Sequence, residues 1–214
     1  MYSREIENHK ENLSLNSRQL RILLGSLLGD AHLESQSRPE IARLKIEHSY
    51  KQKEYVDWLY KEFKEWVRNG PREKTRRVWG KEYKKYCFTT LSHTDLGNIR
   101  KLFYENDKKI VPKELLENYL DELSLAIWFM DDGSVKSKKH KGVFLNTQGF
   151  TLREVKKLQE ILKENFSIES TTREDKNGEQ IYLGSDSGEK FIDTTREYIL
   201  PCFEYKIPKP LKLT

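Results

Sequence analysis

LLGSLLGDA at residues 23–31 and LAIWFMDDG at residues 125–133 are apolar stretches that end alike. Asp30 and Asp132 occupy the same place, next to last, in each stretch. Continuous apolar character of this length is typical of a buried helix. For one stretch alone, a core helix that ends in a polar residue is an adequate explanation. Two copies in one chain indicate an internal repeat.

The segments that follow the two stretches come in one order, which supports the repeat. After the first stretch we expect an alternating strand, a helix, a polar strand pair that turns near Gly80 and a further helix, at residues 41–48, 50–67, 72–90 and 94–106. After the second we expect a strand, a helix that opens with a Thr151–Glu154 capping box, a hairpin that turns at Asn177-Gly178 and a closing helix, at residues 143–150, 151–165, 167–184 and 187–200.

The sequence therefore predicts an α+β fold of two pseudo-symmetric αββαββα halves with antiparallel sheets. The expected divisions are an N-terminal extension, a first half, a connecting segment with a helix at residues 112–120, and a second half, at residues 1–16, 17–106, 107–122 and 123–214. We expect the two apolar helices to pack together at the interface between the halves.

Composition limits the classes of function. Lys and Arg outnumber Asp and Glu by 39 to 34, an excess too small to indicate a nucleic-acid partner without knowing where the charges lie. The two cysteines lack metal-binding spacing. No apolar signal stretch opens the chain, and no apolar run reaches the roughly 20 residues of a membrane span. We expect an intracellular protein, of cytoplasm or organelle, with no membrane partner.

Asp30 and Asp132 sit at a chemically unfavourable place, the negative end of a helix dipole. If the two helices pack side by side, two carboxylates come together and repel unless a cation neutralises them. A hard divalent cation such as Mg²⁺ prefers oxygen ligands. Carboxylate-bound metal ions suit phosphoryl transfer, whereas a glycosidase carboxylate pair is the competing interpretation. The basic strands argue against a glycosidase.

Both stretches resemble the nine-residue motif of the LAGLIDADG homing endonucleases, with Asp30 and Asp132 at its catalytic position. Two motifs in one chain are typical of the monomeric branch of that family. Further segments are similar to the mitochondrial enzymes of the omega-intron type, and they lie at residues 115–120, 145–148 and 205–208. The resemblance runs over residues 20–210.

The resemblance implies roles for further residues. Gly29 and Asp131 would offer backbone oxygens to metal. Lys109 and Lys206 would lie at the rim of the active site and stabilise phosphate charge or organise water. Polar residues near the attacking water would be Glu47 and Asn146. Mg²⁺ is the implied cofactor, and Mn²⁺ or Ca²⁺ would substitute for it in binding.

The motifs also depart from the family pattern. Leu28 replaces the first Asp of the first motif and Ala31 its closing Gly. Ile127 and Trp128 are bulky where the family has small residues. These changes concern the packing of the two helices and leave both catalytic aspartates in place.

The resemblance implies a double-stranded DNA target held by two saddle-shaped sheets along the major groove, cut across the minor groove to leave short 3′ overhangs. Basic residues on the predicted strands and loops supply DNA contacts: Arg43, Lys45, Arg72, Lys74, Arg76, Arg77, Lys81, Lys84, Lys85, Lys136, Lys138 and Arg173. A run of charges on a solvated face is the simpler explanation for any one of them.

A second hypothesis of a different class stays open: a non-catalytic nucleic-acid binder, such as a maturase that assists intron RNA in splicing. Loss of one motif aspartate would favour it, and both are present. A protein with both activities is a third reading, with intron RNA as an additional partner.

Overall fold

The computed structural model describes residues 4–35, 38–137 and 140–208. The chain divides into two compact units, which are described separately. Unit 1 comprises Met1–Leu20 and Asp30–Leu102, and unit 2 comprises Arg21–Gly29 and Phe103–Thr214. The division passes through the first apolar stretch, so the body of that helix packs with the second unit.

Unit 1 is built around a four-stranded antiparallel sheet with the order β1-β2-β4-β3. Its elements are α1 (Arg4–Glu11), the first turn of α2 (Ser17–Leu28), β1 (His32–Glu34), β2 (Arg43–Ser49), α3 (Lys53–Glu62), β3 (Arg72–Val78), β4 (Lys81–Thr89) and α4 (Thr94–Phe103). Short 3-10 turns at Tyr50–Gln52 and Lys64–Trp66 flank α3.

Unit 2 repeats this plan with the strand order β7-β8-β10-β9. Its elements are β5 (Tyr104–Glu105), β6 (Lys108–Lys109), α5 (Lys113–Tyr119), α6 (Glu122–Asp132), β7 (Gly133–Ser137), β8 (His140–Leu145), α7 (Leu152–Phe166), β9 (Thr171–Asp175), β10 (Gly178–Leu183), α8 (Ser185–Thr195) and two 3-10 turns at Arg196–Tyr198 and Pro201–Lys206. The matching strand orders confirm the predicted αββαββα repeat.

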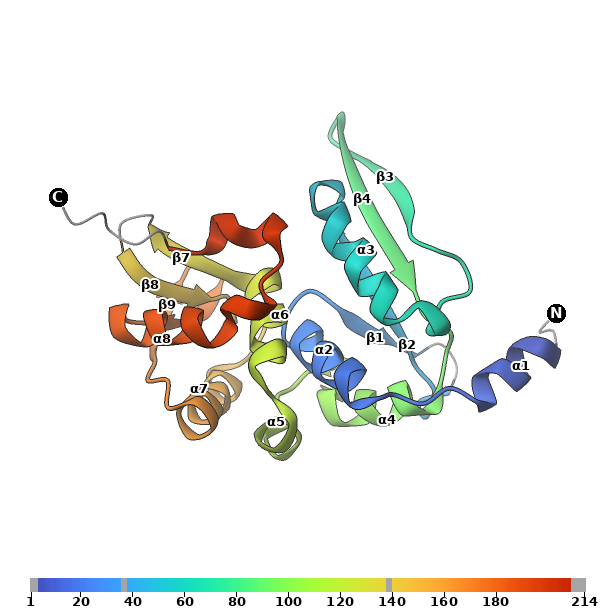
Figure 1. Ribbon diagram of the computed structural model, residues 1–214, viewed down its shortest axis with the longest axis horizontal. Helices are drawn as coiled ribbons and strands as arrows, with labels where there is room; N and C mark the ends of the chain where they lie inside the picture. The colour runs from blue at the N-terminus through green and yellow to red at the C-terminus, as the bar shows by residue number, and fades with distance from the viewer. Residues whose placement is uncertain (1–3, 36–37, 138–139, 209–214) are drawn as a thin grey trace. The chain divides into compact units, whose positions relative to one another are not determined.

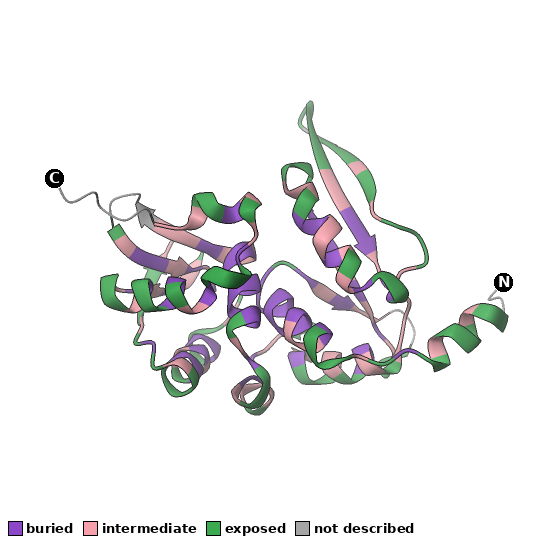
Figure 2. Ribbon diagram, in the orientation of Figure 1, coloured by how far each residue is buried: buried purple, intermediate pink, exposed green. Residues whose placement is uncertain are grey.

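Hydrophobic periodicity explains how each unit closes its core. In β2, every second residue is buried, so that Leu44, Ile46 and His48 point inward while the polar residues between them do not. α3 covers that inner face, with Tyr55 and Leu59 fully buried (Figures 1 and 2). In unit 2, α6 is buried along its whole apolar length, as the purple ribbon in Figure 2 shows.

β3 and β4 form a long hairpin that rises to a narrow tip (Figure 1). Trp79 and Gly80 make the turn, and both have positive φ, 47° and 76°. Positive φ at both central residues is the pattern of a type I′ turn, whose twist matches that of the flanking strands. β2 pairs with β4 only as far as Ser49↔Lys85, so the outer part of the hairpin is a two-stranded ribbon.

The predicted element boundaries needed correction at several places. β1 and β7, the first strand of each half, had no predicted bounds, because three to five largely polar residues give too short an alternation to recognise. The strand expected at residues 143–150 is β8 and ends at Leu145. The second hairpin turns at residues 176–177, since Gly178 already pairs with Asp175. The predicted Thr151 cap is confirmed, since its side chain accepts from the Glu154 backbone N–H, but the Glu154 carboxylate accepts from the Val111 backbone N–H instead of closing a capping box.

Candidate active site

The two motif helices pack against each other within unit 2 through Gly25. A Cβ atom on Gly25 would lie 2.8 Å from Cβ of Ile127, and closer still to the Ser124 carbonyl oxygen. Ser124 Oγ donates a 2.9 Å hydrogen bond to the Arg21 carbonyl across the same contact. The bulky Ile127 therefore fits because its neighbour is glycine, which accounts for one of the two bulky residues of the second motif.

A second close approach lies at the end of the motifs, between Gly29 and Asp131. A Cβ atom on Gly29 would lie 2.5 Å from Oδ2 of Asp131. These two residues immediately precede Asp30 and Asp132 in the sequence. The backbone that leads into each motif aspartate is thus held against its counterpart.

Two lysines bind the carbonyl groups at these helix ends. Lys109 Nζ donates to the Gly29 oxygen at 2.8 Å. Lys206 Nζ donates to the oxygens of Phe129, Met130 and Asp131 at 3.2, 2.6 and 3.2 Å. A cation at a helix C-terminus is favoured by about 0.3–1 kcal/mol, which offsets the unfavourable position of the aspartates. The structure therefore places both predicted lysines at the ends of the motifs.

In unit 1, the Asp30 carboxylate faces a histidine that sequence reasoning did not single out. His48 Nδ1 lies 3.5 Å from Asp30 Oδ2. The His48 side chain is 2% exposed and the Asp30 side chain 49%. The Tyr55 ring of α3 packs edge-on against the imidazole, with ring centroids 5.1 Å apart. The one signal in the sequence that could have identified His48 is its place on the apolar side of the alternating strand β2.

In unit 2, the corresponding aspartate is joined to Asn146. The backbone N–H of Asn146 donates a 3.0 Å hydrogen bond to the backbone carbonyl of Asp132. Gln180, from β10, donates from Nε2 to Oδ1 of Asn146 at 2.6 Å. Asn146 lies just beyond β8, not within a strand as expected, and Gln180 was not predicted.

Glu47 is held in a cluster of charges on β2, β3 and β4. Lys85 donates to its Oε1 at 2.7 Å and Lys74 to its Oε2 at 3.3 Å. The hydrogen bond from Lys85 is the main cause that lowers the pKa of the Glu47 carboxyl from its usual 4.5, and burial opposes it. Extending the antiparallel register His32↔Lys45 by two residues puts Glu47 opposite Asp30, and extending Gly133↔Leu145 by one puts Asn146 opposite Asp132. Glu47 and Asn146 therefore occupy equivalent places after their motifs.

The LAGLIDADG DNA endonuclease family matches residues 20–191, which include both motifs. This chain belongs to that family. A probable intron-encoded endonuclease 1 of Wickerhamomyces canadensis is 32% identical over 211 residues, covering 96% of this chain and 90% of that protein. The cytochrome b mRNA maturase bI2 of Debaryomyces hansenii is 33% identical over 202 residues, covering 92% and 76%.

Among solved structures, the homing endonuclease I-WcaI bound to its DNA recognition sequence has a TM-score of 0.90 and 31% identity, covering 95% of this chain and 92% of that one. The predicted α+β fold with antiparallel sheets is confirmed, and so is the prediction of a DNA endonuclease, a hydrolase of phosphodiester bonds. Along the described ranges, no helix combines the length and the apolar character needed to cross a membrane.

In this LAGLIDADG endonuclease, most of the predicted DNA-contacting residues of unit 1 share one face of its sheet. The registers Arg72↔Cys87, Lys74↔Lys85, Arg76↔Tyr83 and Glu47↔Cys87 put alternate residues of the three strands on the same side. We call this side the basic face; its cations are Arg43, Lys45, Arg72, Lys74, Arg76, Lys81 and Lys85.

Arg77 and Lys84 fall on the opposite side of the hairpin. There Lys84 pairs with Glu73 at 2.9 Å and Arg77 lies 3.7 Å from Glu82. This is the side that α3 covers lower in the sheet, where Tyr60 packs against Phe88. The structure therefore separates these two residues from the other predicted contacts.

The predicted contacts of unit 2 are only partly described. Arg173 is on β9, with its guanidinium 4.1 Å from the Tyr182 ring centroid. The backbone of Lys136 belongs to β7 rather than to a loop, while its side chain is not described. Lys138 lies outside the described residues.

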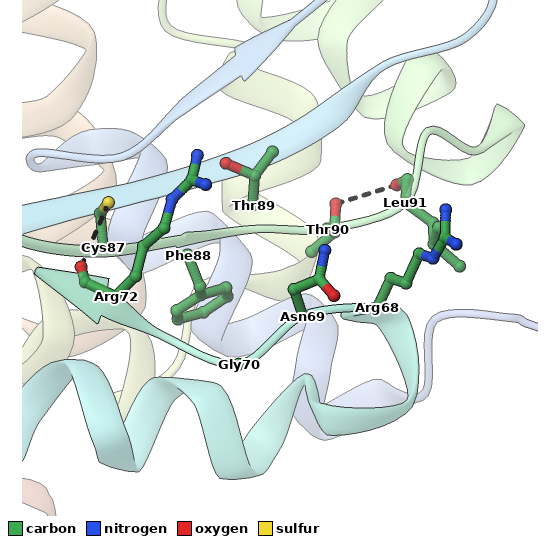
Figure 3. A pocket seen from close by; sticks show the side chains of 9 residues that line it. All are labelled: Arg68, Asn69, Gly70, Arg72, Cys87, Phe88, Thr89, Thr90 and Leu91. Atoms are coloured by element: carbon green, nitrogen blue, oxygen red, sulfur yellow. Dashed lines mark hydrogen bonds between the residues drawn. The ribbon is translucent and has the colours of Figure 1, made fainter.

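A cavity of about 140 Å³ opens where β3 begins and β4 ends (Figure 3). Arg68 and Arg72 lie at its two ends, with Asn69 and Thr89 between them, and no carboxylate lines it. Cys87 donates from Sγ to the Arg72 carbonyl at 3.6 Å. Neither motif aspartate lines this cavity, which is suited to an anion rather than to catalysis.

Proposed function

We propose that this protein cuts both strands of one long double-stranded DNA site, with Asp30 and Asp132 as the metal-binding catalytic residues and short 3′ overhangs as the product. The contact between Gly29 and Asp131 carries the proposal. Each is followed by its motif aspartate, and consecutive Cα atoms are only about 3.8 Å apart. One chain would then supply both halves of the active site and act as a monomer.

The residues at these motif ends fit a divalent cation. Carboxylate and carbonyl oxygens are the ligands that Mg²⁺, Mn²⁺ and Ca²⁺ prefer, and the half-exposed Asp30 carboxylate is open to a hydrated ion. Asp30 and Asp132 would supply carboxylates, and Gly29 and Asp131 backbone oxygens. Bound there, such an ion stabilises charge on the attacking and leaving oxygens of the phosphate and lowers the pKa of water.

The protein's own groups would orient the reactants around the scissile phosphates. Lys109 and Lys206 are cations fixed at the ends of the motifs, where they would stabilise negative charge that develops on phosphate oxygens. Asn146, oriented by Gln180, and Glu47, oriented by Lys85, would accept hydrogen bonds from water on either side. The two halves thus offer different polar groups at equivalent positions.

The basic face would bind the DNA. Of its cations, Lys74 and Lys85 are bound to Glu47, and Arg43 to Glu34 at 2.6 Å. Arg72 and Arg76 have no carboxylate partner within the described part of the chain. Guanidinium groups so placed suit phosphate oxygens or guanine edges in the major groove. Arg68 and Arg72, at the cavity of Figure 3, would hold a backbone phosphate.

The test uses a duplex that joins the sequences on either side of the coding gene, labelled on each strand in turn. The wild-type protein with Mg²⁺ should cut both strands, and EDTA should abolish cutting. Asp30→Asn and Asp132→Asn should bind this duplex in Ca²⁺ yet fail to cut it. Asp186→Asn, at an exposed site on α8, is the matched control and should cut normally. Full cutting by either motif variant would refute the assignment.

RNA maturation is the second candidate function, favoured by the similarity to the maturase of Debaryomyces hansenii. Splicing assistance does not require phosphodiester cleavage by the protein. If this chain is also a maturase, the Asp30→Asn variant should still promote splicing of the intron that flanks its gene. If wild-type protein leaves the splicing rate unchanged, the maturase hypothesis fails while the endonuclease proposal stands.

A further inference from the structure

The tip of the β3–β4 hairpin carries a tryptophan in a place that neither burial nor turn geometry favours. Trp79 is 99% exposed, whereas Trp66 and Trp128 are buried at 1% and 0%. Its φ of 47° is a left-handed conformation that bulky side chains rarely adopt, and Asn or Gly is preferred at the first position of such a turn. The folded chain by itself therefore gives no reason for Trp79.

The charges beside Trp79 differ between the two sides of the hairpin. On the basic face, every charged residue of β3 and β4 is a cation, and Arg76 and Lys81 lie nearest the tip. On the other side, the acidic Glu73 and Glu82 each pair with a cation. The asymmetry persists in the outer ribbon, beyond the end of β2, where no core needs to be closed.

A second aromatic side chain lies on the basic face near the tip. Tyr83 is 51% exposed and stands opposite Arg76 in the strand register. Aromatic rings interleaved with cations suit a contact with duplex DNA, because rings can make apolar contacts with base edges such as the thymine methyl group while cations neutralise phosphates. A two-stranded ribbon is also narrow enough to enter the major groove of B-DNA.

We propose that Trp79, supported by Tyr83, makes an aromatic contact with duplex DNA at an outer end of the target site, apart from the catalytic centre. The occupant is DNA rather than protein because Arg76 and Lys81, the cations of the basic face nearest the tip, pair with no carboxylate in the described part of the chain. This inference rests on the proposed DNA-cutting function and extends it: the outermost base pairs would be held by apolar contact with the aromatic rings, and the inner ones by charge and hydrogen bonds.

The experiment compares Trp79→Ala with Arg76→Ala on the labelled junction duplex, in Ca²⁺ and over a range of salt concentrations. Trp79→Ala should weaken binding about tenfold, because an apolar contact of the indole ring is lost. The slope of log affinity against log salt should not change, because a neutral side chain releases no counterions. Arg76→Ala should lower that slope by about 1. Trp79→Phe, which keeps a ring, should retain most of the affinity.

Footprinting and fluorescence locate the contact. Trp79→Ala should lose protection at one end of the footprint while the cleavage position stays the same. The fluorescence that Trp79 contributes is the difference between wild type and Trp79→Phe. Adding the duplex should quench this difference. Unchanged affinity together with an unchanged footprint in Trp79→Ala would overturn the proposal. A wild-type protein that binds no duplex would instead overturn the proposed function itself, so the two failures are distinguishable.

Discussion

Lys109 donates a hydrogen bond to the carbonyl of Gly29, the residue just before Asp30, at 2.8 Å. The other half of the repeat has the same relationship, since Lys206 donates to the carbonyl of Asp131, just before Asp132. Each lysine follows the closing helix of one repeat: Lys109 lies in β6, after α4, and Lys206 ends the last 3-10 turn, after α8. The pseudo-symmetry therefore reaches individual hydrogen bonds at the C-terminal end of each motif.

Replacing these lysines should separate cutting from binding. Lys109→Met and Lys206→Met should each slow DNA cleavage at least tenfold, because a cation near the phosphate stabilises the transition state more than the bound substrate. Lys206→Met should also lower the free energy of unfolding by about 1–2 kcal/mol, since Lys206 binds three carbonyl groups and Lys109 one. Single-turnover cleavage, Ca²⁺-supported DNA binding and urea unfolding measure the three quantities.

The control for both lysines is Lys101→Met, at an exposed position on α4. It should leave the cleavage rate and the stability unchanged. If Lys109→Met weakens binding and cutting by the same factor, Lys109 is a phosphate contact only.

The contact at Gly25 makes a prediction about stability. Gly25→Ala should destabilise the protein by about 1–3 kcal/mol, because the new methyl group would press on the Ser124 backbone and on Ile127. The better helix propensity of alanine, worth about 1 kcal/mol, opposes this loss only in part. Thermal and urea unfolding provide the measurement.

Gly149→Ala is the matched control, because nothing lies within 4 Å of a Cβ atom built there. Its free energy of unfolding should change by less than about 0.5 kcal/mol. Equal stability of the two variants would show that the motif helices separate at little cost.

Much of the fold could be predicted because it rests on local pattern. The apolar motif stretches, the alternation of β2 and the Thr151 cap are visible in short windows, and the structure has each of them. The packing of Gly25 against Ile127 is not local. Ile127 looked like a defect in the motif until the glycine opposite it was known.

The candidate site was predicted less completely, for a related reason. His48 and Gln180 acquire their roles from tertiary neighbours, Asp30 and Asn146, which are distant in the sequence. Arg77 and Lys84 were grouped with the other cations of the hairpin because the side on which each residue lies depends on the strand register. That register is fixed by the position of the turn, which the charge pattern alone does not define to the residue.

The charge cluster at Glu47 should make stability depend on pH. Its folded pKa is lowered from 4.5, so its ionised form stabilises the protein above that value, and this contribution disappears as the pH falls through the folded pKa. Glu47→Gln should therefore be less stable than wild type near pH 7, by less than about 1 kcal/mol because the pair is partly solvated. Urea unfolding should show the difference shrink as the pH falls below 4.5 and through the folded pKa.

Glu105→Gln, at an exposed position on β5, controls for a general effect of removing one carboxylate. Its stability should follow the wild-type curve. A Glu47→Gln difference that persists unchanged in acid would mean that the ion pairs with Lys74 and Lys85 are not its source.

The proximity of His48 to Asp30 predicts unequal cutting of the two DNA strands. The equivalent position of unit 2 holds Thr147, whose hydroxyl donates to the Glu179 carbonyl at 2.7 Å. A change at His48 therefore alters the surroundings of Asp30, while Thr147 at the equivalent position keeps its own hydrogen bond. His48→Leu should slow one strand at least tenfold more than the other, so that nicked DNA accumulates on a substrate labelled on each strand in turn.

Two further variants distinguish a positioning role of His48 from a purely structural one. His48→Asn, which keeps a nitrogen near the place of Nδ1, should restore much of the slowed strand. His93→Leu is the matched control, because that imidazole packs edge-on against Trp66 with the same 5.1 Å centroid distance that joins His48 to Tyr55. It should lose stability without favouring a strand. If His48→Leu slows both strands alike, the imidazole supports the fold around β2 and does not position Asp30.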